Sequence, residues 1–324
     1  MPSLVSVIIP TYNRAHCLGE AIDSVLAQDP PADEVIVIDD GSTDATPDVL
    51  AGYGDRITVL RQANAGAGAA RTAGLRQASG DWITFLDSDD LWYPGRLALL
   101  HHDLERPQAR DIVMHMADVR FTGEGYDHEL FDLRGWPVGD GDAERVEDPL
   151  SRAISALHLN SFAARRDAAA NTQGFPTELK ISQDSYFMCA ISAQGPALFS
   201  RTTVAEVRRI AGDDAANVEL FRTDPVRARR IVQRRFDLLL DLPLTAAQHR
   251  LVRRHASGNL FKLAQAEAQS RTGRHRQILI RMARTHPNPG VGWLKALPPL
   301  LLGQTGFEIV TRKKTGFSRV TGKA

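Results

Sequence analysis

The sequence predicts an α/β fold: an open, mostly parallel sheet with helices on both faces, followed by a mainly helical C-terminal region. Three observations lead to this prediction. Short β-branched runs alternate with segments of helical apolar spacing over the first 90 residues. Polar clusters follow the predicted strands, and the chain from residue 225 onward has helical character. A β-α-β-α order implies parallel strands joined by right-handed crossovers.

The first half supplies the strands and helices of this sheet in turn. Strands buried in a parallel sheet are typically short, continuous apolar runs, and four such runs occur at residues 4–10, 34–38, 57–60 and 82–86. Helical spacing appears at residues 17–28, 44–51 and 69–78. Beyond Gly95 we expect helices at residues 96–104, 150–157 and 185–193, a strand at residues 111–116, and loops over residues 121–149.

The C-terminal part predicts helices at residues 226–240, 246–268 and 274–284. Residues 291–302 are apolar, but the run is short and contains Pro298 and Pro299. Two interpretations are open for this run. It is either an interfacial segment beside basic residues or a segment packed on the main domain, and packing is favoured.

Length and composition narrow the class of protein. A chain of 324 residues with 43% hydrophobic residues suits one large domain with an appendage, or two domains. The two cysteines, Cys17 and Cys189, cannot form a disulfide framework, which indicates a reducing compartment. There is no apolar run of about 18 residues and no secretory signal pattern, so we expect a cytoplasmic protein without a spanning helix.

The net charge of zero hides a sharp asymmetry. Residues 1–215 hold 18 basic and 33 acidic residues, whereas residues 216–324 hold 21 basic and 6 acidic residues. We therefore predict two regions with a boundary between residues 215 and 216. The basic region suits phosphates, in nucleic acid, anionic lipid or a lipid-linked diphosphate; alternatively, it packs on the acidic region. Nucleic acid is disfavoured because the arginines lack interleaved aromatic residues.

Polar clusters at residues 11–14, 39–44, 64–71 and 87–90 fall at or after the ends of predicted strands. Ligands bind beyond the carboxyl ends of the strands in such sheets. Asp87 and Asp89 are two residues apart, and two close carboxylates repel unless a cation lies beside them. Mg²⁺ and Mn²⁺ prefer oxygen ligands and commonly bind substrate phosphates as well. The alternative is that Asp87 or Asp90 caps the following helix.

Two common nucleotide-binding patterns are absent. The loop at residues 66–71 has Arg71 where G-x-G-x-x-G needs its third glycine, and it follows the third predicted strand rather than the first. No P-loop pattern occurs either. A small-residue loop ending in an arginine can still approach a phosphate closely.

Five segments together resemble glycosyltransferase family 2. They are VSVIIPTYNR (5–14), DEVIVIDDGSTDAT (33–46), NAGAGAARTAGL (64–75), GDWITFLDSDD (80–90) and GFPTELKISQDSYF (174–187). The resemblance covers roughly residues 4–210 and implies the Rossmann-like GT-A fold. It also implies an inverting transferase that uses a nucleotide-diphosphate sugar and a divalent metal, Mn²⁺ or Mg²⁺.

The resemblance assigns a role to individual residues. Asp184 matches the catalytic base and Asp89 matches the metal ligand. Asp39 matches the aspartate that accepts a hydrogen bond from uracil in uridine-using members. The nucleotide-sugar site is expected to comprise Pro10, Thr11, Tyr12, Asp39, Arg71, Asp87 and Ser88.

The sequence departs from the family pattern at Thr72, where Asn is common, and in two places that bear more directly on the site. Gln183 precedes Asp184 where an acidic residue is common, and the region 207–212 lacks the histidine that many members direct toward the metal or diphosphate. Arg208 or Arg209 could meet the diphosphate instead. His115 and His158 are expected to be packed or partly exposed rather than ligands, because neither belongs to a ligand-spaced cluster.

These observations predict a glycosyltransferase of polysaccharide biosynthesis that moves a sugar from a nucleotide sugar to a glycan or lipid-linked acceptor. The family resemblance favours a UDP-sugar as the donor. A peripheral contact of the basic region with the cytoplasmic face of a membrane stays open. Two alternatives remain. One is a sugar nucleotidyltransferase, which would need glycines in the first β-α turn, where residues 10–14 have none. The other is a catalytically silent relative that binds a glycan or partner.

Overall fold

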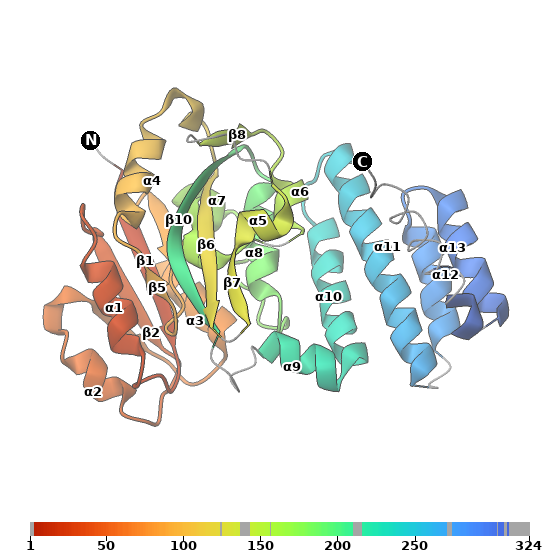
Figure 1. Ribbon diagram of the computed structural model, residues 1–324, viewed down its shortest axis with the longest axis horizontal. Coiled ribbons are helices and arrows are strands. Elements are labelled where there is room, and N and C mark those ends of the chain that lie inside the picture. The colour runs from red at the N-terminus through yellow and green to blue at the C-terminus, as the bar shows by residue number, and fades with distance from the viewer. Residues whose placement is uncertain are drawn as a thin grey trace. The chain divides into compact units, whose positions relative to one another are not determined.

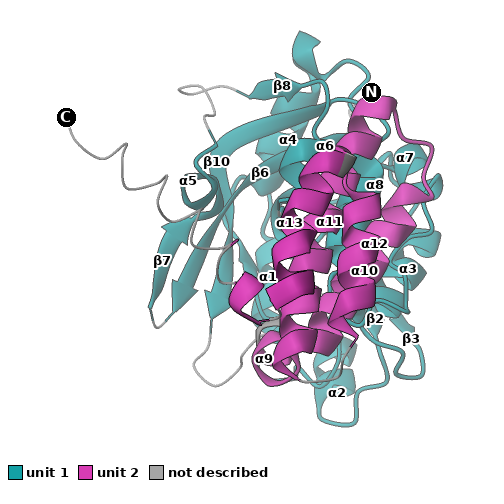
Figure 2. Cartoon of the chain, turned by 90° about the vertical axis from the view of Figure 1, so that its right-hand side faces the viewer, with its two compact units in different colours: residues 1–214 teal, residues 215–324 magenta. Residues whose placement is uncertain are grey.

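The structure is a computed structural model that describes residues 3–123, 125–136, 143–155, 157–209, 216–270, 274–302, 304–307 and 310. The chain separates into two compact units, Met1–Asp214 and Ala215–Ala324 (Figure 2). The sequence placed a boundary between residues 215 and 216, next to residues 210–215, which lie outside the described residues.

The first unit is built on one mixed sheet (Figure 1). Its described strands are β1 (Val5–Thr11), β2 (Glu34–Asp39), β3 (Thr58–Arg61), β4 (Trp82–Phe85), β5 (Leu91–Trp92), β6 (Met114–Gly123), β7 (Tyr126–Glu129), β8 (Glu144–Val146), β9 (Phe162–Arg165) and β10 (Ala197–Arg209). Their order is β3-β2-β1-β4-β9-β6-β10-β5, with β7 paired to β6 and β8 to β10.

The first four strands are parallel, as the sequence predicts. In the register of β1 and β2, Thr11 lies beside Asp39, so both strands end at the same edge. From β1 the chain adds β2 and β3 on one side, and then returns to the other side of β1 to form β4. The direction in which strands are added therefore reverses between β1 and β4. A crevice for ligands forms outside the carboxyl ends of the strands at such a reversal.

The second half of the sheet departs from a parallel arrangement. β9 runs antiparallel to both of its neighbours, β4 and β6, and β5 runs antiparallel to β10. The chain enters β9 directly from a 3-10 turn, η3 (Leu159–Ser161), at the edge where β4 ends. Because the chain enters β9 at the edge where β4 ends, β9 has to run in the opposite direction to β4.

Helices cover both faces of the sheet (Figure 2). Those described in the first unit are α1 (Leu18–Leu26), α2 (Thr46–Ala51), α3 (Ala67–Gln77), α4 (Arg96–Leu104), α5 (Leu130–Arg134), α6 (Leu150–Ala153), α7 (Arg166–Ala170) and α8 (Gln183–Ser192). Short 3-10 turns also occur at η1 (Gly54–Arg56) and η2 (Pro107–Ala109). Alternate residues of one strand reach opposite faces: Thr84 of β4 meets Arg96 of α4, whereas Phe85 meets Phe187 of α8.

Close packing fixes α3 on β1. A Cβ added at Gly74 would lie 2.5 Å from Cγ2 of Ile8, so only glycine fits there without a shift. Beside this contact, Phe175 stacks on Phe187 at 4.4 Å between ring centroids and meets Phe85 edge-on at 5.5 Å. These rings tie α8 and the segment before it to β4.

The second unit is helical in its described residues. Its helices are α9 (Ala216–Thr223), α10 (Pro225–Leu240), α11 (Ala246–Gln269), α12 (His275–Thr285) and α13 (Pro289–Leu302). Asp224 caps α10 by accepting the backbone N–H of Arg227 at 2.9 Å, and Thr245 begins α11 with a capping box.

Several element boundaries differ from the sequence prediction. The strand expected at residues 111–116 begins only at Met114, because Asp111 adopts a left-handed turn conformation with φ 62°. The expected loop 121–149 contains β7, α5 and β8 in its described residues, and the helix expected at residues 150–157 ends at Ala153. Pro298 and Pro299 lie inside α13, where packing on α12 outweighs their unfavourable helix propensity.

Candidate functional site

The predicted polar clusters meet at one edge of the sheet. Asp39, the last residue of β2, is 1% exposed, and its Oδ1 accepts the backbone N–H of Ser42 at 2.8 Å. Arg61, at the end of β3, places Nε 3.4 Å from Oδ2 of Asp39. The carboxylate of Asp39 is therefore held in a fixed orientation at the end of its strand.

The neighbouring Asp40 organises the loop after β3, a role that the sequence did not reveal. Its side chain accepts hydrogen bonds from Nε2 of Gln62 at 2.6 Å and from the backbone N–H groups of Ala65 and Gly66 at 3.0 and 2.7 Å. The Asp39-Asp40 pair itself was visible in the sequence. Only the fold shows that the second aspartate shapes the loop leading into α3.

The segment after β1 lies next to these groups. Pro10 and Thr11 are buried at the end of β1, whereas Tyr12 is 45% exposed, which leaves a ring surface available to a planar ligand. Arg14 reaches across the strand-order reversal, and its Nη2 lies 3.3 Å from Oδ2 of Asp89. The residues that follow β1 and β4 are thus in direct contact.

Arg71 and Asp87 form a partly buried ion pair, in which the side chain of Arg71 is 8% exposed and that of Asp87 29%. Nη2 of Arg71 lies 2.5 Å from Oδ1 of Asp87. Burial is the largest influence and alone would raise the pKa of Asp87, but the charge and hydrogen bond of Arg71, with the charges of His158 and Arg209, together hold that pKa below its usual value. Burial would likewise lower the pKa of Arg71, but the charges of Asp87 and then Asp184 raise it. Asp184, which is distant in sequence, therefore shares the electrostatic environment of this pair.

Asp90 differs from its neighbours because it is buried among donors. Asn160 donates to its Oδ2 at 2.6 Å, and the backbone N–H of Arg208 donates to its Oδ1 at 2.8 Å. Burial, followed by the negative charges of Asp87 and Asp89, raises the pKa of Asp90 well above its usual value. Oδ1 of Asn160 also accepts the backbone N–H of Asp87 at 3.1 Å, so this asparagine orders the whole turn. Neither Asp87 nor Asp90 caps α4, because the N-cap of that helix is Gly95.

Asp184 lies in the first turn of α8 and is half-buried. The N-cap of this helix is Ser182, with φ 65°, so the helix begins two residues before the predicted start and Asp184 is not its cap. Oδ1 of Asp184 accepts the backbone N–H of Ser185 at 2.7 Å. A negatively charged side chain interacts favourably with a helix N-terminus, so this position suits an aspartate.

His158 belongs to the same cluster. It is half-buried, as expected, and its Nδ1 accepts the backbone N–H of Asn160 at 3.4 Å. Burial lowers the pKa of His158, while the charges of Asp87 and Asp184 oppose that effect. Its ring meets Phe121 edge-on at 5.6 Å, and the guanidinium of Arg209 lies 5.5 Å from the same Phe121 ring. Local spacing in the sequence could not place His158 here.

Four buried polar atoms around this edge have no hydrogen-bond partner among the described residues. They are Thr11 Oγ1, Arg71 Nε, Gln183 Oε1 and Arg208 Nη2. A buried polar group without a partner costs free energy, so such atoms are expected where a polar ligand completes the site. They come from β1, α3, α8 and β10, which all border the predicted crevice.

The residues after β4 suit a cation held by a single carboxylate. Asp87 is paired with Arg71, and the proton affinity of Asp90 is raised, whereas the side chain of Asp89 is 34% exposed. No group of three or more His, Cys, Asp or Glu side chains within the described ranges could enclose a metal ion. The donor set thus fits an ion that takes one ligand from Asp89 and the others from a substrate. The partly exposed ion pair between Arg14 and Asp89 is weak enough to break when such an ion binds.

Two further residues considered in the sequence analysis, His115 and Cys17, are buried. His115 is fully buried and lies 2.9 Å from Asp103, as expected for a core histidine. Cys17 is 7% exposed, and burial raises the pKa of its thiol. Cys17 lies near the Arg14–Asp89 pair, whose charges have smaller and opposite effects on that pKa.

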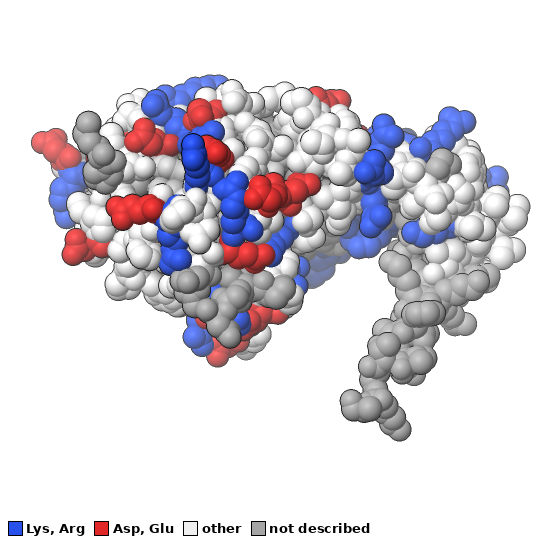
Figure 3. Space-filling model, turned by 90° about the horizontal axis from the view of Figure 1, so that it is seen from above, with Lys and Arg blue, Asp and Glu red and all other residues white. Residues whose placement is uncertain are grey.

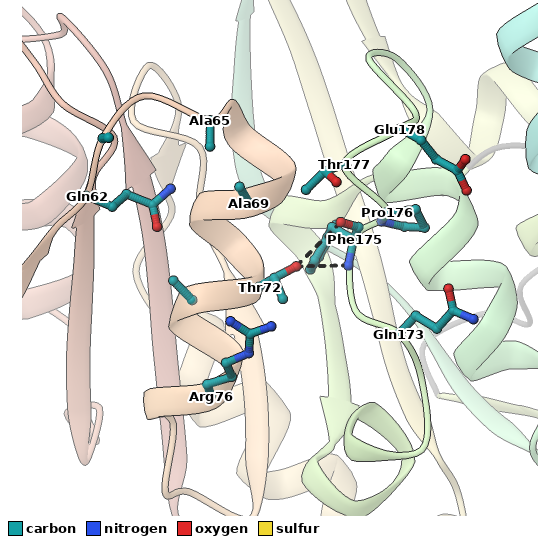
Figure 4. Close-up of a pocket in the computed structure, with 12 residues that line it drawn as sticks. Gln62, Ala65, Ala69, Thr72, Arg76, Gln173, Phe175, Pro176, Thr177 and Glu178 are labelled. Carbon is teal, nitrogen blue, oxygen red and sulfur yellow. Dashed lines mark hydrogen bonds between the residues drawn. The ribbon is translucent and has the colours of Figure 1, made fainter.

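A cavity of about 550 Å³ lies along the outer face of α3 (Figure 4). Gln62, Ala69, Thr72 and Arg76 line one side of it, and the loop at residues 173–178 lines the other. Oγ1 of Thr72 accepts the backbone N–H of Phe175 at 3.1 Å, which joins the two sides. None of the residues predicted to bind the donor lines this cavity.

Residues 6–149 match the sequence model of the family described as glycosyl transferase family 2. An uncharacterized glycosyltransferase of Rickettsia typhi (strain ATCC VR-144 / Wilmington) is 34% identical over 146 residues, or 40% of this chain and 46% of the relative. The chain carries a glycosyl transferase family 2 domain. The putative teichuronic acid biosynthesis glycosyltransferase TuaG of Bacillus subtilis (strain 168) is 44% identical over 98 residues, or 29% of this chain and 39% of TuaG. These matches span less than half the length of either relative.

Solved structures confirm the GT-A fold. S. aureus TarS 1–349 in complex with UDP-GlcNAc aligns with a TM-score of 0.69 and 21% identity, covering 94% of this chain and 88% of that one. The mannosyltransferase PcManGT from Pyrobaculum calidifontis, in complex with GDP-Man and Mn²⁺, aligns with a TM-score of 0.56 and 20% identity, covering 96% and 84%. The fold class predicted from the sequence is therefore correct, including the helical C-terminal region.

Proposed function

We propose that this family 2 chain is an inverting glycosyltransferase that moves a sugar from a nucleotide-diphosphate sugar, with UDP favoured, to a hydroxyl group of a glycan or lipid-linked acceptor. The observation that carries the proposal is the meeting of the Arg71–Asp87 pair, Asp89 and Asp184 at the edge where β4 ends. Assembly of polysaccharide in the cytoplasm, the setting predicted from the sequence, remains part of this proposal.

The donor site is assigned to the ends of β1, β2 and β4. Asp39 presents an oriented carboxylate that can accept a hydrogen bond from a base N–H, and Tyr12 offers an exposed ring beside it. Arg71 positions Asp87 for a ribose hydroxyl. The neighbours TarS and PcManGT were solved with UDP-GlcNAc and GDP-Man, which supports a nucleotide sugar but leaves the base to be tested.

The leaving group of such a donor is a nucleoside diphosphate, on which negative charge grows as the anomeric bond breaks. Asp89 would hold a divalent cation, Mn²⁺ or Mg²⁺, and the cation supplies charge stabilisation to the diphosphate when bound. Arg208 and Arg209, at the end of β10, lie close enough to the Asp87–Asp90 turn to add positive charge. Arg208 donates from Nε to the backbone oxygen of Asp89 at 2.8 Å.

Asp184 is proposed as the general base. The acceptor hydroxyl is a weak nucleophile, and a carboxylate within hydrogen-bond reach can take its proton during attack. Attack from the side opposite the leaving diphosphate inverts the anomeric carbon. Gln183 is neutral, so it adds no second charge beside Asp184, and the base is a single carboxylate.

The first prediction concerns the variant Asp184→Asn. It should lower the rate of sugar transfer by about 10²–10⁴-fold, because it removes the proton acceptor. Donor binding should change by less than about twofold, since the amide keeps the shape of the side chain. Transfer assays and calorimetric donor titrations measure the two effects separately. Asp48→Asn, at an exposed position on α2, is the matched control. Unchanged turnover combined with lost donor binding would contradict the assigned role.

Product analysis separates this function from the two alternatives. A glycosyltransferase releases a nucleoside diphosphate from its donor, whereas a sugar nucleotidyltransferase releases pyrophosphate when it forms a nucleotide sugar. A silent binding relative would turn over no nucleotide sugar from a broad panel while still binding a glycan. Release of nucleoside diphosphate that depends on Asp184 would support the proposal against both.

A further inference from the structure

Helix α13 exposes an apolar outward face. The side chains of six large apolar residues in this helix are at least 36% exposed: Val291, Trp293, Leu294, Leu297, Leu301 and Leu302. Leu294 and Leu301 are the most exposed, at 72% and 78%. Leu294, Leu297 and Leu301 are spaced by three and four residues, so they form a stripe along one side of the helix. Monomeric soluble proteins seldom expose such a continuous stripe.

The inner face of α13 is packed independently of that stripe. Ala296 and Phe307 are fully buried in a cluster with Leu279, Met282 and Ala283, and Phe307 meets Phe261 at 5.3 Å. A Cβ added at Gly292 would lie 2.6 Å from the backbone oxygen of Ala283, so α13 and α12 approach closely. The outward leucines therefore add nothing to this core, and their exposure needs another explanation.

Basic side chains are exposed on α13 and on the helix packed against it. Lys295 is exposed on α13 itself, and Arg276 and Arg284 are exposed on α12, which packs against it. Residues 216–324 hold 21 basic and 6 acidic residues. Figure 3 shows Lys and Arg gathered over the second unit on the face seen from above, whereas the first unit shows both signs of charge. A partner that covers the stripe would therefore be favoured by negative charge.

We propose that the α13 face docks on an anionic lipid surface. A helix of 14 residues is about 21 Å long, shorter than the roughly 30 Å hydrocarbon core of a bilayer. Among the described residues, no helix is both long and apolar enough to span a membrane. The helix would instead lie along the interface, with Leu294 and Leu301 in the acyl region, Trp293 near the headgroups, and Lys295 and Arg284 beside lipid phosphates.

Vesicle flotation with the full-length protein tests this proposal. Vesicles of phosphatidylcholine containing phosphatidylglycerol should carry the protein upward, and vesicles of phosphatidylcholine alone should carry much less. The double variant Leu294→Ser/Leu301→Ser should weaken binding by at least about tenfold, because it removes two apolar side chains from the acyl region. Leu133→Ser, at a leucine of α5 that is 56% exposed, is the matched control and should bind like the unchanged protein.

Three results would overturn the proposal. They are equal binding to neutral and anionic vesicles, unchanged binding of the double variant, and a dimer in solution that the double variant abolishes, which would assign the face to a second copy of this chain. Thermal unfolding of the variants shows that they remain folded. The assay contains no nucleotide sugar, so its outcome is independent of the proposed transferase activity.

Discussion

At the scale of single residues, the turn after β4 shows how one short acidic segment holds three different carboxylates. Asp87 is paired with Arg71, Asp89 is partly exposed beside Arg14, and Asp90 is buried among neutral donors. The sequence predicted a site here from the spacing of Asp87 and Asp89. It could not separate the role of Asp90, because the partner that decides it, Asn160, lies 70 residues away.

Asp118 provides a prediction about pH that does not involve the site. Its buried carboxylate accepts the backbone N–H groups of Val119 and Phe131, but burial dominates and raises its pKa to about 6. The folded protein therefore binds a proton at this residue that the unfolded chain, with a pKa of about 3.9, has already released. This contribution to stability is present below about pH 4 and is lost as the pH rises through 6.

Asp118→Asn removes that loss, since an amide is neutral at every pH. The free energy of unfolding of the variant minus that of the unchanged protein should rise by about 2 kcal/mol from pH 4.5 to pH 7.5. Denaturant unfolding at both values measures the difference. A constant offset between the two proteins across this range would show that the carboxyl group titrates normally in the folded state.

At the scale of elements, the sequence predicted the first half of the sheet better than the second. Strands β1, β2 and β4 are short, buried apolar runs, β3 is a more exposed edge strand, and each is followed by polar residues that mark its end. β10 is long and irregular: it includes exposed polar residues, and its register against β6 shifts between Phe199 and Ala205. Such a bulge breaks the period of two on which strand prediction depends.

The contact of α3 with β1 supports a prediction about stability. Gly74→Ala places a methyl group 2.5 Å from Cγ2 of Ile8 in a core that is already packed. We expect the free energy of unfolding to fall by about 1–3 kcal/mol, despite the better helix propensity of alanine. Chemical denaturation with a spectroscopic readout measures the change.

Gly19→Ala in α1 is the matched control. The nearest atom to its new Cβ is Oη of Tyr53 at 3.5 Å, an ordinary contact, so alanine should be neutral or stabilising there by up to about 1 kcal/mol. If Gly74→Ala behaved like Gly19→Ala, the close packing of α3 on β1 would not hold.

At the scale of the whole molecule, the topology explains why the site could be anticipated. Parallel strands bring their carboxyl ends to one edge, so clusters far apart in sequence meet without any knowledge of side-chain contacts. The matched family segment, residues 6–149, includes Asp39, Arg71, Asp87 and Asp89 but not Asp184 or His158. His158 caps η3, and Asp184 lies in the first turn of α8. The placement of these two elements depends on the antiparallel β9 and on aromatic packing that no local pattern predicts.

Calorimetric titration of UDP, with and without Mn²⁺, is the most direct test of the claim that these carboxylates form a site for a nucleoside diphosphate. We predict that the unchanged protein binds UDP more tightly with Mn²⁺, and that Asp89→Ala loses this increase while the exposed control Asp48→Ala keeps it. Failure of UDP and of every other nucleoside diphosphate to bind, or an unchanged Mn²⁺ effect in Asp89→Ala, would contradict the account.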